Sequence, residues 1–418
     1  MTSTTAAVNP SRASSRSANL RGKRAAMLVF SYYPMDPRPR RAAEALVTEG
    51  MSVDLICLGG SKGDSRRETV NGVDVRRLPL ERRRGGAVGY VFQYGAFLLA
   101  CLLILAARSL TRRYDLVYVH NMPDVLVVSA LVPRMLGAKV ILDLHDPMPE
   151  LMMTIFGFGP QSVGVRLLRR LERWSIARAD VAITVNRACQ RLFASRSCRP
   201  EKIRVVMNSP DESIFGFRPA DEDGIAASHP GRPFVIMYHG SLVERNGLDL
   251  AVAAIARLRP SMPDVELRVY GAETAFLTRV METVRAQGLD GSVRHLGARR
   301  LEEIVGAIEQ CDVGVIPNQR NIFTELNTPT RIFEYLALGK PVIAPRSAGV
   351  QDYFDEDALV FFELGDDEDL ARTIAYVRAE RQKVAGIVRR GQAVYAAHVW
   401  GREREVLLDI VSAVMSPR

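Results

Sequence analysis

The amino-acid sequence predicts an α/β protein with two doubly wound domains, each a parallel sheet covered by helices. Runs of apolar and β-branched residues alternate with helical periodicity through both halves of the chain. At 418 residues the chain is too long for one ordinary core. Its hydrophobic content of 47% and charged content of 25% are typical of a globular protein.

The expected strands are short apolar segments bounded by turn residues. In the first half they are residues 25–32, 52–58, 73–78, 116–120, 139–144, 181–185 and 203–207. In the second half they are residues 234–239, 266–270, 293–296, 313–316, 341–344 and 359–362. Since ligands of such sheets bind beyond the carboxyl ends of the strands, functional residues are expected at strand ends.

A polar, turn-rich segment suggests where the two domains divide. We expect a linker at 213–232, a first domain at 25–212 and a second domain at 233–400. Residues 1–24 are rich in Ser, Ala, Thr and Arg and lack an apolar core, so we expect a disordered tail and not a signal peptide.

The charge is divided unevenly between the halves. Residues 1–215 hold 32 lysines and arginines against 18 acidic residues, whereas residues 216–418 hold 24 against 29. A basic half can face nucleic acid, an anionic membrane or an acidic substrate. Because no nucleic-acid module or interleaved aromatic pattern accompanies the arginines, we expect no nucleic-acid partner and favour a membrane or anionic acceptor. Five cysteines without a CxxC pair indicate reduced thiols and a cytoplasmic protein without a zinc site.

The most informative stretch is TPTRIFEYLALGKPVIA, residues 328–344. Thr328 fits an N-cap and Pro329 the first helical position, while Gly339 ends the helix before a short buried strand. The positive end of such a helix suits a phosphate. Glu334 within the helix is badly placed for a phosphate but suits neutral sugar hydroxyls, because an ionised carboxylate only accepts hydrogen bonds. The alternative is that Glu334 merely pairs with Arg331 three residues back.

Two nucleotide-binding classes lose support from missing motifs. The first strand ends in SYYPMDPRPRR, and the first strand of the second half ends in YHGSLVERNG. Neither contains the GxGxxG fingerprint that lets a backbone approach a dinucleotide pyrophosphate, and no Walker motif occurs. A nicotinamide or flavin dehydrogenase and a P-loop enzyme are therefore disfavoured.

Four motifs in order give the chain a family resemblance. They are FSYYPMDPRPRRAAEALVTEG, LDLHDPMPE, YHGSLVERNGLDLAV and TPTRIFEYLALGKPVIA. With them the chain resembles the GT-B-fold glycosyltransferases, specifically the retaining glycosyltransferase family 4, from about Arg24 to the C-terminus. The resemblance implies two Rossmann-like domains facing across a cleft, the first binding an acceptor and the second a nucleotide-sugar donor. It also implies that the C-terminal helix, 402–415, packs back on the first domain.

The resemblance also implies residues of a donor site. Glu334 looks like the acid that binds the ribose, while Gly240, Thr330 and Arg331 border the diphosphate. Arg245 looks like the cation that neutralises the leaving diphosphate, since arginine can donate two parallel hydrogen bonds to phosphate. The alternative for Arg245 is a surface arginine beside Glu244.

On the acceptor side, His145 matches the family histidine that lies near the transferred sugar. It can hydrogen-bond a sugar hydroxyl or steady the diphosphate, although a histidine at a strand end can also be structural. Asp146 could orient His145 or meet the acceptor. Asp36 and Arg38, after the first strand, are further candidates for acceptor contact.

The chain departs from the family pattern at two places. The second acid that many members carry eight residues before Glu334 is here Leu326, and either Glu325 or Asn327 could replace it. The usual lysine after the donor arginine is Asn246. We expect no metal or other cofactor, because no carboxylate cluster such as DxD is evident at a strand end.

Residues 87–107 form 21 uncharged positions between groups of arginines. The length would permit a transmembrane helix, but a span would place strands of one sheet on opposite sides of a bilayer. The alternatives are a helix buried on its own sheet, or a helix that packs on the sheet while its 82–94 end touches anionic lipid. The residues expected at that contact are Arg82, Arg83, Arg84 and Tyr90.

These features together predict a cytoplasmic glycosyltransferase, peripheral at the inner face of the cell membrane. It would transfer a sugar from a nucleotide-diphosphate donor to a lipid-linked or polysaccharide acceptor in surface polysaccharide or glycolipid biosynthesis. Two alternatives remain: a non-catalytic nucleotide-sugar-binding scaffold, which Leu326 makes conceivable, and a GT-B-fold epimerase or phosphorylase.

Overall fold

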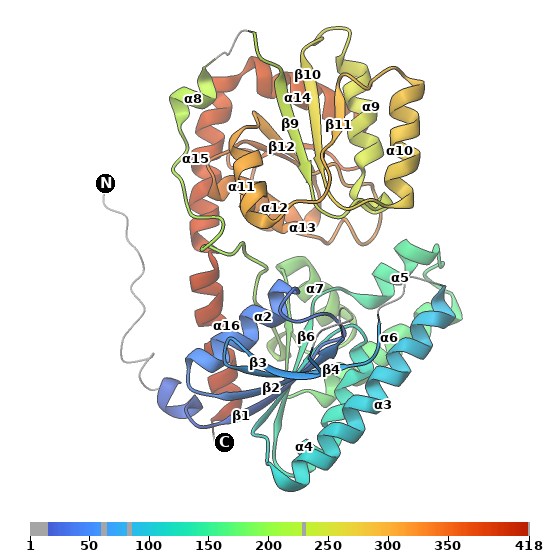
Figure 1. Ribbon diagram of the computed structural model, residues 1–418, viewed down its shortest axis with the longest axis vertical. Helices are drawn as coiled ribbons and strands as arrows, with labels where there is room; N and C mark the ends of the chain where they lie inside the picture. The colour runs from blue at the N-terminus through green and yellow to red at the C-terminus, as the bar shows by residue number, and fades with distance from the viewer. Residues whose placement is uncertain (1–15, 60–64, 82–85, 228–230, 417–418) are drawn as a thin grey trace. The chain divides into compact units, whose positions relative to one another are not determined.

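The computed structural model describes residues 16–59, 65–81, 86–227 and 231–416 (Figure 1). The chain divides into two compact units. Unit 1 contains Met1–Met207 and Glu403–Arg418, and unit 2 contains Asn208–Arg402. Each unit has one sheet with helices packed on it, and the two are treated separately below.

The sheet of unit 1 has the strand order β3-β4-β2-β1-β5-β6-β7-β8. Neighbouring strands are parallel except for the pair β3 and β4. The strands are β1 (Arg24–Leu28), β2 (Ser52–Leu58), β3 (Arg67–Val70), β4 (Val73–Leu78), β5 (Leu116–His120), β6 (Lys139–Leu144), β7 (Val181–Thr184) and β8 (Ile203–Val205). All seven expected strands occur. β3 was not expected, because it is a short, polar edge strand that is almost wholly exposed.

Helical segments connect these strands and cover the sheet of unit 1. They are α2 (Pro37–Thr48), α3 (Ala87–Thr111), η1 (Asp124–Ala130), α4 (Leu131–Met135), α5 (Met148–Phe156), α6 (Val163–Arg178), α7 (Arg187–Arg196) and η2 (Pro200–Lys202). After β4 the chain crosses to the other side of β1 and continues with β5. The carboxyl ends of β1 and β5 therefore form a topological switch point, where ligands of such sheets bind.

Residues 16–20 form a helical turn that is tied into unit 1. Arg16 pairs with Glu49, Glu405 and Asp409, and Leu20 is fully buried. Glu405 and Asp409 belong to α16 (Trp400–Met415), whose residues from Glu403 onward are part of unit 1. The expected disordered tail is therefore wrong for residues 16–24, because these charge pairs hold the segment in place. Residues 1–15 of that expectation lie outside the described residues.

The sheet of unit 2 is wholly parallel, with the order β11-β10-β9-β12-β13-β14. Its strands are β9 (Phe234–His239), β10 (Val265–Tyr270), β11 (Val293–His295), β12 (Val313–Val315), β13 (Val342–Arg346) and β14 (Val360–Glu363). Its helical segments are α8 (Glu222–Ala226), η3 (Glu244–Asn246), α9 (Leu248–Leu258), α10 (Ala275–Ala286), α11 (Leu301–Glu309), α12 (Thr330–Ala337), α13 (Ala348–Gln351), α14 (Asp367–Ala379) and α15 (Arg381–Ala397). The switch point of this sheet lies at the carboxyl ends of β9 and β12.

Helix α12 (Thr330–Ala337) begins one residue later than the sequence suggested. Pro329 is the N-cap, and the Thr328 hydroxyl donates to the Gly349 carbonyl at 2.6 Å instead of capping the helix. The expectation that Thr328 caps α12 is therefore wrong, because its hydroxyl fastens the preceding loop to α13. Gly339 follows the helix with φ at +67°, the left-handed conformation expected of a helix-ending glycine.

Candidate active site

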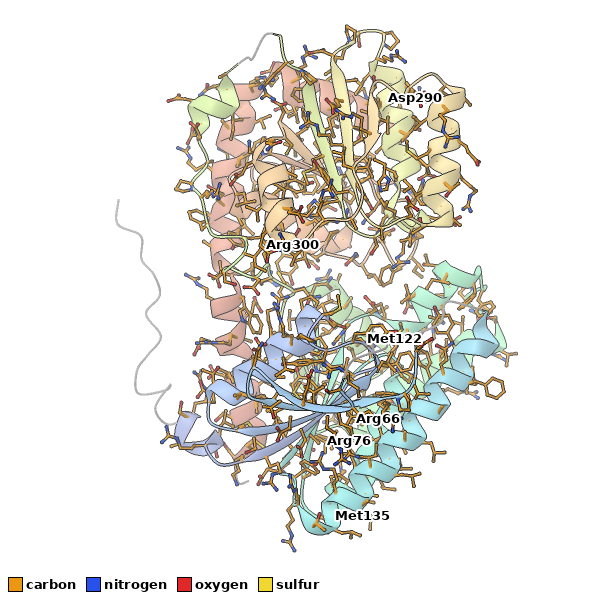
Figure 2. All side chains as sticks on the ribbon, in the orientation of Figure 1. Arg66, Arg76, Met122, Met135, Asp290 and Arg300 are labelled. Carbon is orange, nitrogen blue, oxygen red and sulfur yellow. The ribbon has the colours of Figure 1, made fainter. Side chains whose placement is uncertain are left out.

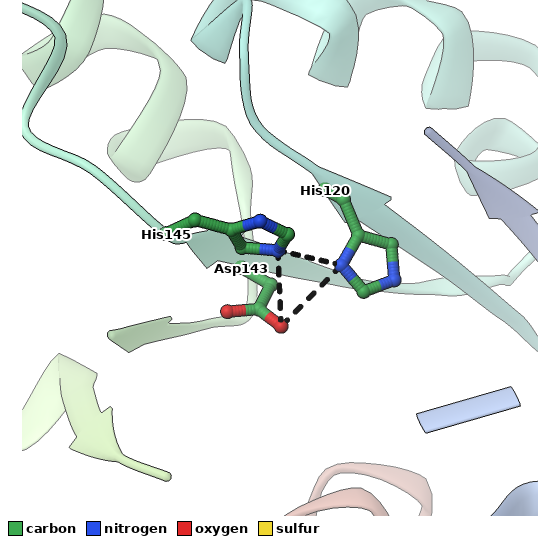
Figure 3. Close-up of side chains that lie close together, drawn as sticks. All are labelled: His120, Asp143 and His145. Carbon is green, nitrogen blue, oxygen red and sulfur yellow. Dashed lines mark hydrogen bonds and ion pairs between the residues drawn. The ribbon is translucent and has the colours of Figure 1, made fainter. Parts of the chain in front are cut away.

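In unit 1, the pairing of β5 with β6 gathers three polar side chains at the carboxyl ends of the strands. The register places His120, the last residue of β5, opposite Asp143 of β6, and His145 follows the end of β6. His120 Nδ1 and His145 Nε2 lie 2.9 Å apart, and Asp143 Oδ2 lies 3.4 Å from the first and 3.7 Å from the second (Figure 3). The sequence identified His145 but missed its two partners.

Asp143 is the buried anion at the centre of this cluster, which we call the His–Asp–His cluster. Arg38 donates to both of its carboxylate oxygens, the shortest contact being 2.6 Å from Nη2 to Oδ1. Tyr118 donates its hydroxyl to Asp143 Oδ2 at 3.0 Å. Burial is the largest single effect and would raise the pKa of Asp143, but the Arg38 guanidinium together with His145 and His120 outweighs it and holds that pKa well below its ordinary value. Asp143 is therefore ionised at physiological pH.

The three side chains could in principle offer ligand atoms to a metal ion, since these atoms all lie within 4.8 Å of one another. However, Asp143 Oδ2 already accepts hydrogen bonds from Tyr118 and Arg38. A cation at this point would also lie beside the buried Arg38 guanidinium. These three side chains therefore fit a hydrogen-bonded network, in which the Asp143–Arg38 ion pair lies beside a neutral histidine, better than they fit a metal centre.

The proton positions in the His–Asp–His cluster follow from burial. His120 is fully buried, and burial lowers its pKa, so it is neutral. Its Nε2 atom has no hydrogen-bond partner among the described residues, so the proton belongs on Nδ1, where Asp143 and His145 can accept it. Because His145 Nε2 then accepts from His120, the proton of a neutral His145 lies on Nδ1. His145, whose side chain is 18% exposed, therefore has Nδ1 as the donor for a ligand.

Arg38 does not have the role that the sequence suggested. Its side chain is 9% exposed, its guanidinium binds Asp143, and Nη1 donates to the Val206 carbonyl at 2.9 Å. The prediction that Arg38 contacts the acceptor is therefore wrong, because its guanidinium is bound to Asp143 of the His–Asp–His cluster inside unit 1. Asp36 is half-buried and caps α2 by accepting from the Arg38 amide.

Asn121 holds the loop that follows β6. Its Oδ1 accepts from the His145 amide at 2.8 Å, and its Nδ2 donates to the Asp146 carbonyl at 2.8 Å and to Asp124 Oδ1 at 3.0 Å. The same Asn121 side chain thus holds the backbone of both His145 and Asp146. Burial raises the pKa of Asp124 to about 7. Asn121, which the sequence did not suggest as a site residue, therefore fixes the loop that bears His145.

In unit 2, Glu334 belongs to a chain of hydrogen bonds that links α12 to β9. Glu334 Oε2 lies 2.6 Å from His239 Nε2, His239 Nδ1 lies 3.0 Å from the Tyr335 hydroxyl, and that hydroxyl donates to the Met237 carbonyl at 2.9 Å. His239 is the last residue of β9. The partner of Glu334 is therefore His239, not the Arg331 that the alternative interpretation proposed.

The contacts along this chain involve one oxygen of the Glu334 carboxylate. Since Glu334 Oε2 and His239 Nε2 lie 2.6 Å apart, one proton is shared between these two atoms. His239 therefore fixes Oε2, and the Tyr335 hydroxyl, which donates to the Met237 carbonyl at 2.9 Å, contacts the other nitrogen of the imidazole ring. The other oxygen of Glu334, Oε1, can accept from a ligand hydroxyl.

Arg331, one of the cationic residues expected near a diphosphate, lies against the end of β9 and the loop that follows it. Arg331 Nη1 donates to the His239 carbonyl at 2.6 Å, and its guanidinium lies over the Tyr238 ring. A side chain added at Gly240, whose φ is +123°, would contact Arg331 at 3.5 Å. Thr330 begins α12, whose first turn leaves backbone N–H groups for a ligand. Gly240 and Arg331 therefore lie close together, and Thr330 precedes Arg331 at the start of α12; their contact with a diphosphate stays a prediction.

Arg245 lies in η3 on the same loop, with its guanidinium 5.8 Å from the centre of the Phe323 ring. Its neighbour Glu244 pairs with Arg279. Asn246, at the position of the missing lysine, donates to the Ser241 carbonyl at 2.8 Å. Asn246 therefore supports the loop.

The loop around Leu326 is fastened to α13. Glu325 Oε1 accepts from the Ala348 amide at 3.1 Å, and the Glu325 carbonyl accepts from the Gly349 amide at 3.0 Å. A Cβ atom at Gly349 would come within 2.4 Å of the Asn327 carbonyl oxygen. The Glu325 carboxylate is thus used to cap α13, which argues against Glu325 as a replacement for the missing acid.

The residues expected at a membrane contact fall in two groups. Arg82, Arg83 and Arg84 lie outside the described residues. Tyr90 is half-buried, and its ring packs against Tyr94 and, edge-on, against Phe156 of α5. Tyr90 therefore joins α3 to α5 within unit 1.

Comparison with known proteins agrees with this arrangement. The family model described as a glycosyl transferase 4-like domain matches residues 35–209, in unit 1 and its boundary. A second family model, glycosyl transferases group 1, matches residues 233–379 in unit 2. Each model thus corresponds to one of the two sheets.

Relatives and solved structures point the same way. The chain is 23% identical over 257 residues to the probable glycosyltransferase WbjE of Pseudomonas aeruginosa, covering 60% of this chain and 62% of that protein. It is 22% identical over 176 residues to WcaL of Salmonella typhimurium, a glycosyltransferase named for colanic acid biosynthesis, covering 42% and 41%. The chain thus spans less than two thirds of these relatives.

Two solved structures show the same fold. Sucrose-phosphate synthase from Thermosynechococcus elongatus matches 93% of this chain and 98% of its own, with a TM-score of 0.74 and 17% identity. The Anabaena protein HepE in complex with UDP and glucose matches 94% and 100%, with a TM-score of 0.69 and 17% identity. Two parallel-sheet domains, two family models and these matches confirm the predicted fold. The chain has the GT-B fold, and a glycosyl transferase family model matches each of its two units.

Proposed function

We propose that this chain is a glycosyltransferase that moves a sugar from a nucleoside-diphosphate donor to a lipid-linked or polysaccharide acceptor, with retention of configuration. The proposed setting is surface polysaccharide or glycolipid biosynthesis at the cytoplasmic face of the membrane. The observation that carries the proposal is the Glu334–His239 pair, which fixes a carboxylate beside Arg331 at the switch point of unit 2.

Unit 2 binds the donor in this proposal. Glu334 Oε1 accepts hydrogen bonds from ribose hydroxyls while His239 holds the other oxygen. Arg245, Arg331 and the amides at the start of α12 bind the diphosphate. These cations stabilise the negative charge that develops as the bond between the sugar C1 and the diphosphate oxygen breaks.

Unit 1 binds the acceptor. An acceptor hydroxyl forms the new bond to C1, and its proton passes to the departing diphosphate. His145 donates from Nδ1 to a sugar hydroxyl, and the His–Asp–His cluster keeps that nitrogen protonated. Asp146, beside His145, contributes to the acceptor side.

The relatives support the proposed substrates by analogy. HepE was solved with UDP and glucose, which is consistent with a nucleotide-sugar donor, and WcaL is named for the synthesis of colanic acid. Retention rests on the family resemblance alone. No metal is assigned to the reaction, because Arg245 and Arg331 can neutralise the diphosphate.

The test is a screen of nucleotide sugars with a membrane-lipid extract as the acceptor source, measuring release of nucleoside diphosphate. Wild type is compared with His145→Ala, Glu334→Ala and the exposed control Glu302→Gln. We expect His145→Ala to reduce turnover by about 100-fold while donor binding stays unchanged, and Glu334→Ala to weaken donor binding. Donor binding without release in wild type would favour the scaffold alternative. Unchanged release in both site variants would refute the site.

A further inference from the structure

Helix α3 is anchored to unit 1 along one side. Tyr94, Phe97, Cys101 and Leu105 recur at helical spacing and are buried, the last three completely. Phe30 of the neighbouring β1 loop packs edge-on against Tyr94 and Phe97. This inner stripe gives α3 the packing expected of a helix that covers its own sheet.

The opposite side of α3 is also apolar, but it is exposed. Phe92, Leu99, Leu103 and Leu110 follow one another at intervals of seven, four and seven residues, which places them on one face of the helix. Phe92 is 74% exposed, Leu103 60% and Leu110 80%. From Phe92 to Leu110 this outer stripe extends for about 27 Å, given the rise of an α-helix. A water-facing helix surface normally carries polar side chains instead.

Helix α4 extends the same apolar surface at one end. α4 packs against α3, and its Leu131 and Met135 are exposed, Met135 by 78% (Figure 2). We call Phe92, Leu99, Leu103, Leu110, Leu131 and Met135 together the α3–α4 surface.

The exposed charged residues of the surrounding segment are all basic. The six acidic residues in 86–179 are all buried or half-buried, and Glu150 and Glu172 are paired with Arg196. The exposed charged residues of this segment are all arginines: Arg112, Arg113, Arg134, Arg166, Arg170, Arg173 and Arg178. Arg112 and Arg113 follow the end of α3, and Arg134 precedes Met135. An apolar stripe next to exposed arginines complements an anionic bilayer.

Length and composition alone would also allow α3 to cross a membrane, and only 22% of its most apolar stretch is buried. The inner stripe opposes such a span, since Phe97, Cys101 and Leu105 would have to leave the core. Arg108 also binds Asp54 of β2, and Ser129 of η1 donates to the Leu98 carbonyl. The contacts along the helix therefore favour a position in the plane of the membrane surface.

We propose that the α3–α4 surface inserts into the headgroup and outer acyl region of an anionic phospholipid bilayer, with α3 parallel to the membrane. Arg112, Arg113 and Arg134 bind the lipid headgroups. This surface includes Phe92 from the 82–94 end that the sequence suggested and extends along α3 to Leu110. The inference deepens the membrane setting of the proposed function, but its test is independent of that function, because membrane docking of this surface needs no particular donor or acceptor.

Vesicle flotation of the full chain tests the proposal. Wild type is incubated with vesicles of phosphatidylglycerol and phosphatidylcholine, or of phosphatidylcholine alone. We expect it to float mainly with the anionic vesicles and to be released by alkaline carbonate. Leu99→Glu/Leu103→Glu should bind at least about tenfold more weakly, and Arg112→Glu/Arg113→Glu should lose much of the preference for anionic lipid.

The matched control is Leu301→Glu/Tyr376→Glu, which places the same charges on exposed apolar residues of unit 2. It should float as wild type does. Circular dichroism shows whether each variant is folded. If Leu99→Glu/Leu103→Glu does not fold, the milder variant Leu103→Gln is tested in its place. Wild type that remains in solution, or outer-stripe variants that float as wild type, would overturn the proposal. Resistance to carbonate would indicate a span, and a dimer lost in Leu99→Glu/Leu103→Glu would indicate a protein interface.

Discussion

Replacing Glu334 by Gln tests whether its carboxylate binds a ribose or only completes an internal ion pair. The change keeps the size of the side chain and removes its charge. His239 can still donate to the amide oxygen, because Nε2 lies 2.6 Å from the oxygen that it now holds. The amide NH2 group then replaces Oε1, so the group facing the ribose becomes a donor where the carboxylate was an acceptor.

The structure sets the expected magnitude of this change. A hydrogen bond to a charged group contributes about 1.5–3 kcal/mol, and the substitution removes about one such bond to the ribose. We therefore expect the Kd of a nucleoside diphosphate to rise by roughly 10- to 150-fold. The lower end is favoured because His239 already holds Oε2 at 2.6 Å, so only Oε1 is left to contact the ribose.

Isothermal titration calorimetry with a nucleoside diphosphate measures the change directly. Glu302→Gln provides the control, since Glu302 is exposed on α11 of the same unit. Urea denaturation separates loss of binding from loss of folding. A Kd within about twofold of wild type, with a lowered unfolding midpoint, would show that Glu334 is a structural partner of His239 and would refute ribose binding.

Three further predictions concern unit 1. Asp143→Asn leaves the buried Arg38 without its counter-ion, and urea denaturation should show a loss of about 3–5 kcal/mol; a loss below about 1 kcal/mol would contradict the buried ion pair. Asp124 has its pKa raised to about 7 by burial, so the native state holds its proton more tightly and wild type should lose stability as pH rises from about 4 through 7. Asp124→Asn should flatten that decline in denaturant midpoints, and an unchanged slope would exclude Asp124 as its source. His120→Ala should lower turnover by about 100-fold at unchanged donor Kd, whereas His120→Asn, whose amide can replace Nδ1, should recover part of it. Equal turnover in the two His120 variants would show that the proton delivered to His145 is unimportant.

Much of the fold could be predicted because its signals are local. Apolar β-branched runs marked each parallel strand, and Gly339 marked the end of α12, since one residue in a left-handed conformation ends a helix wherever the helix lies. β3 gave no such signal, because an exposed edge strand needs no apolar face. Residues 16–24 looked disordered by composition, but Arg16 is held by Glu49, which follows α2, and by Glu405 of α16, and such a pairing leaves no trace in composition.

The candidate site was predicted in part for the same reason. Glu334, Gly240, Thr330 and Arg331 lie together in the structure, whereas His239 was missed because it is 95 residues away from Glu334 along the chain. The Arg38 side chain was misassigned, since only the fold shows that it points inward to Asp143.

The sequence by itself determined the two parallel-sheet domains and the identity of the polar residues at the strand ends. Only the tertiary structure decided which of those residues share protons, because hydrogen-bond partners are set by strand register and not by spacing along the chain. α3 shows the same division. Both of its stripes are apolar, so its sequence cannot tell which one is buried, and the packing of Phe97 and Leu105 in the core of unit 1 leaves Leu103 and Leu110 outside.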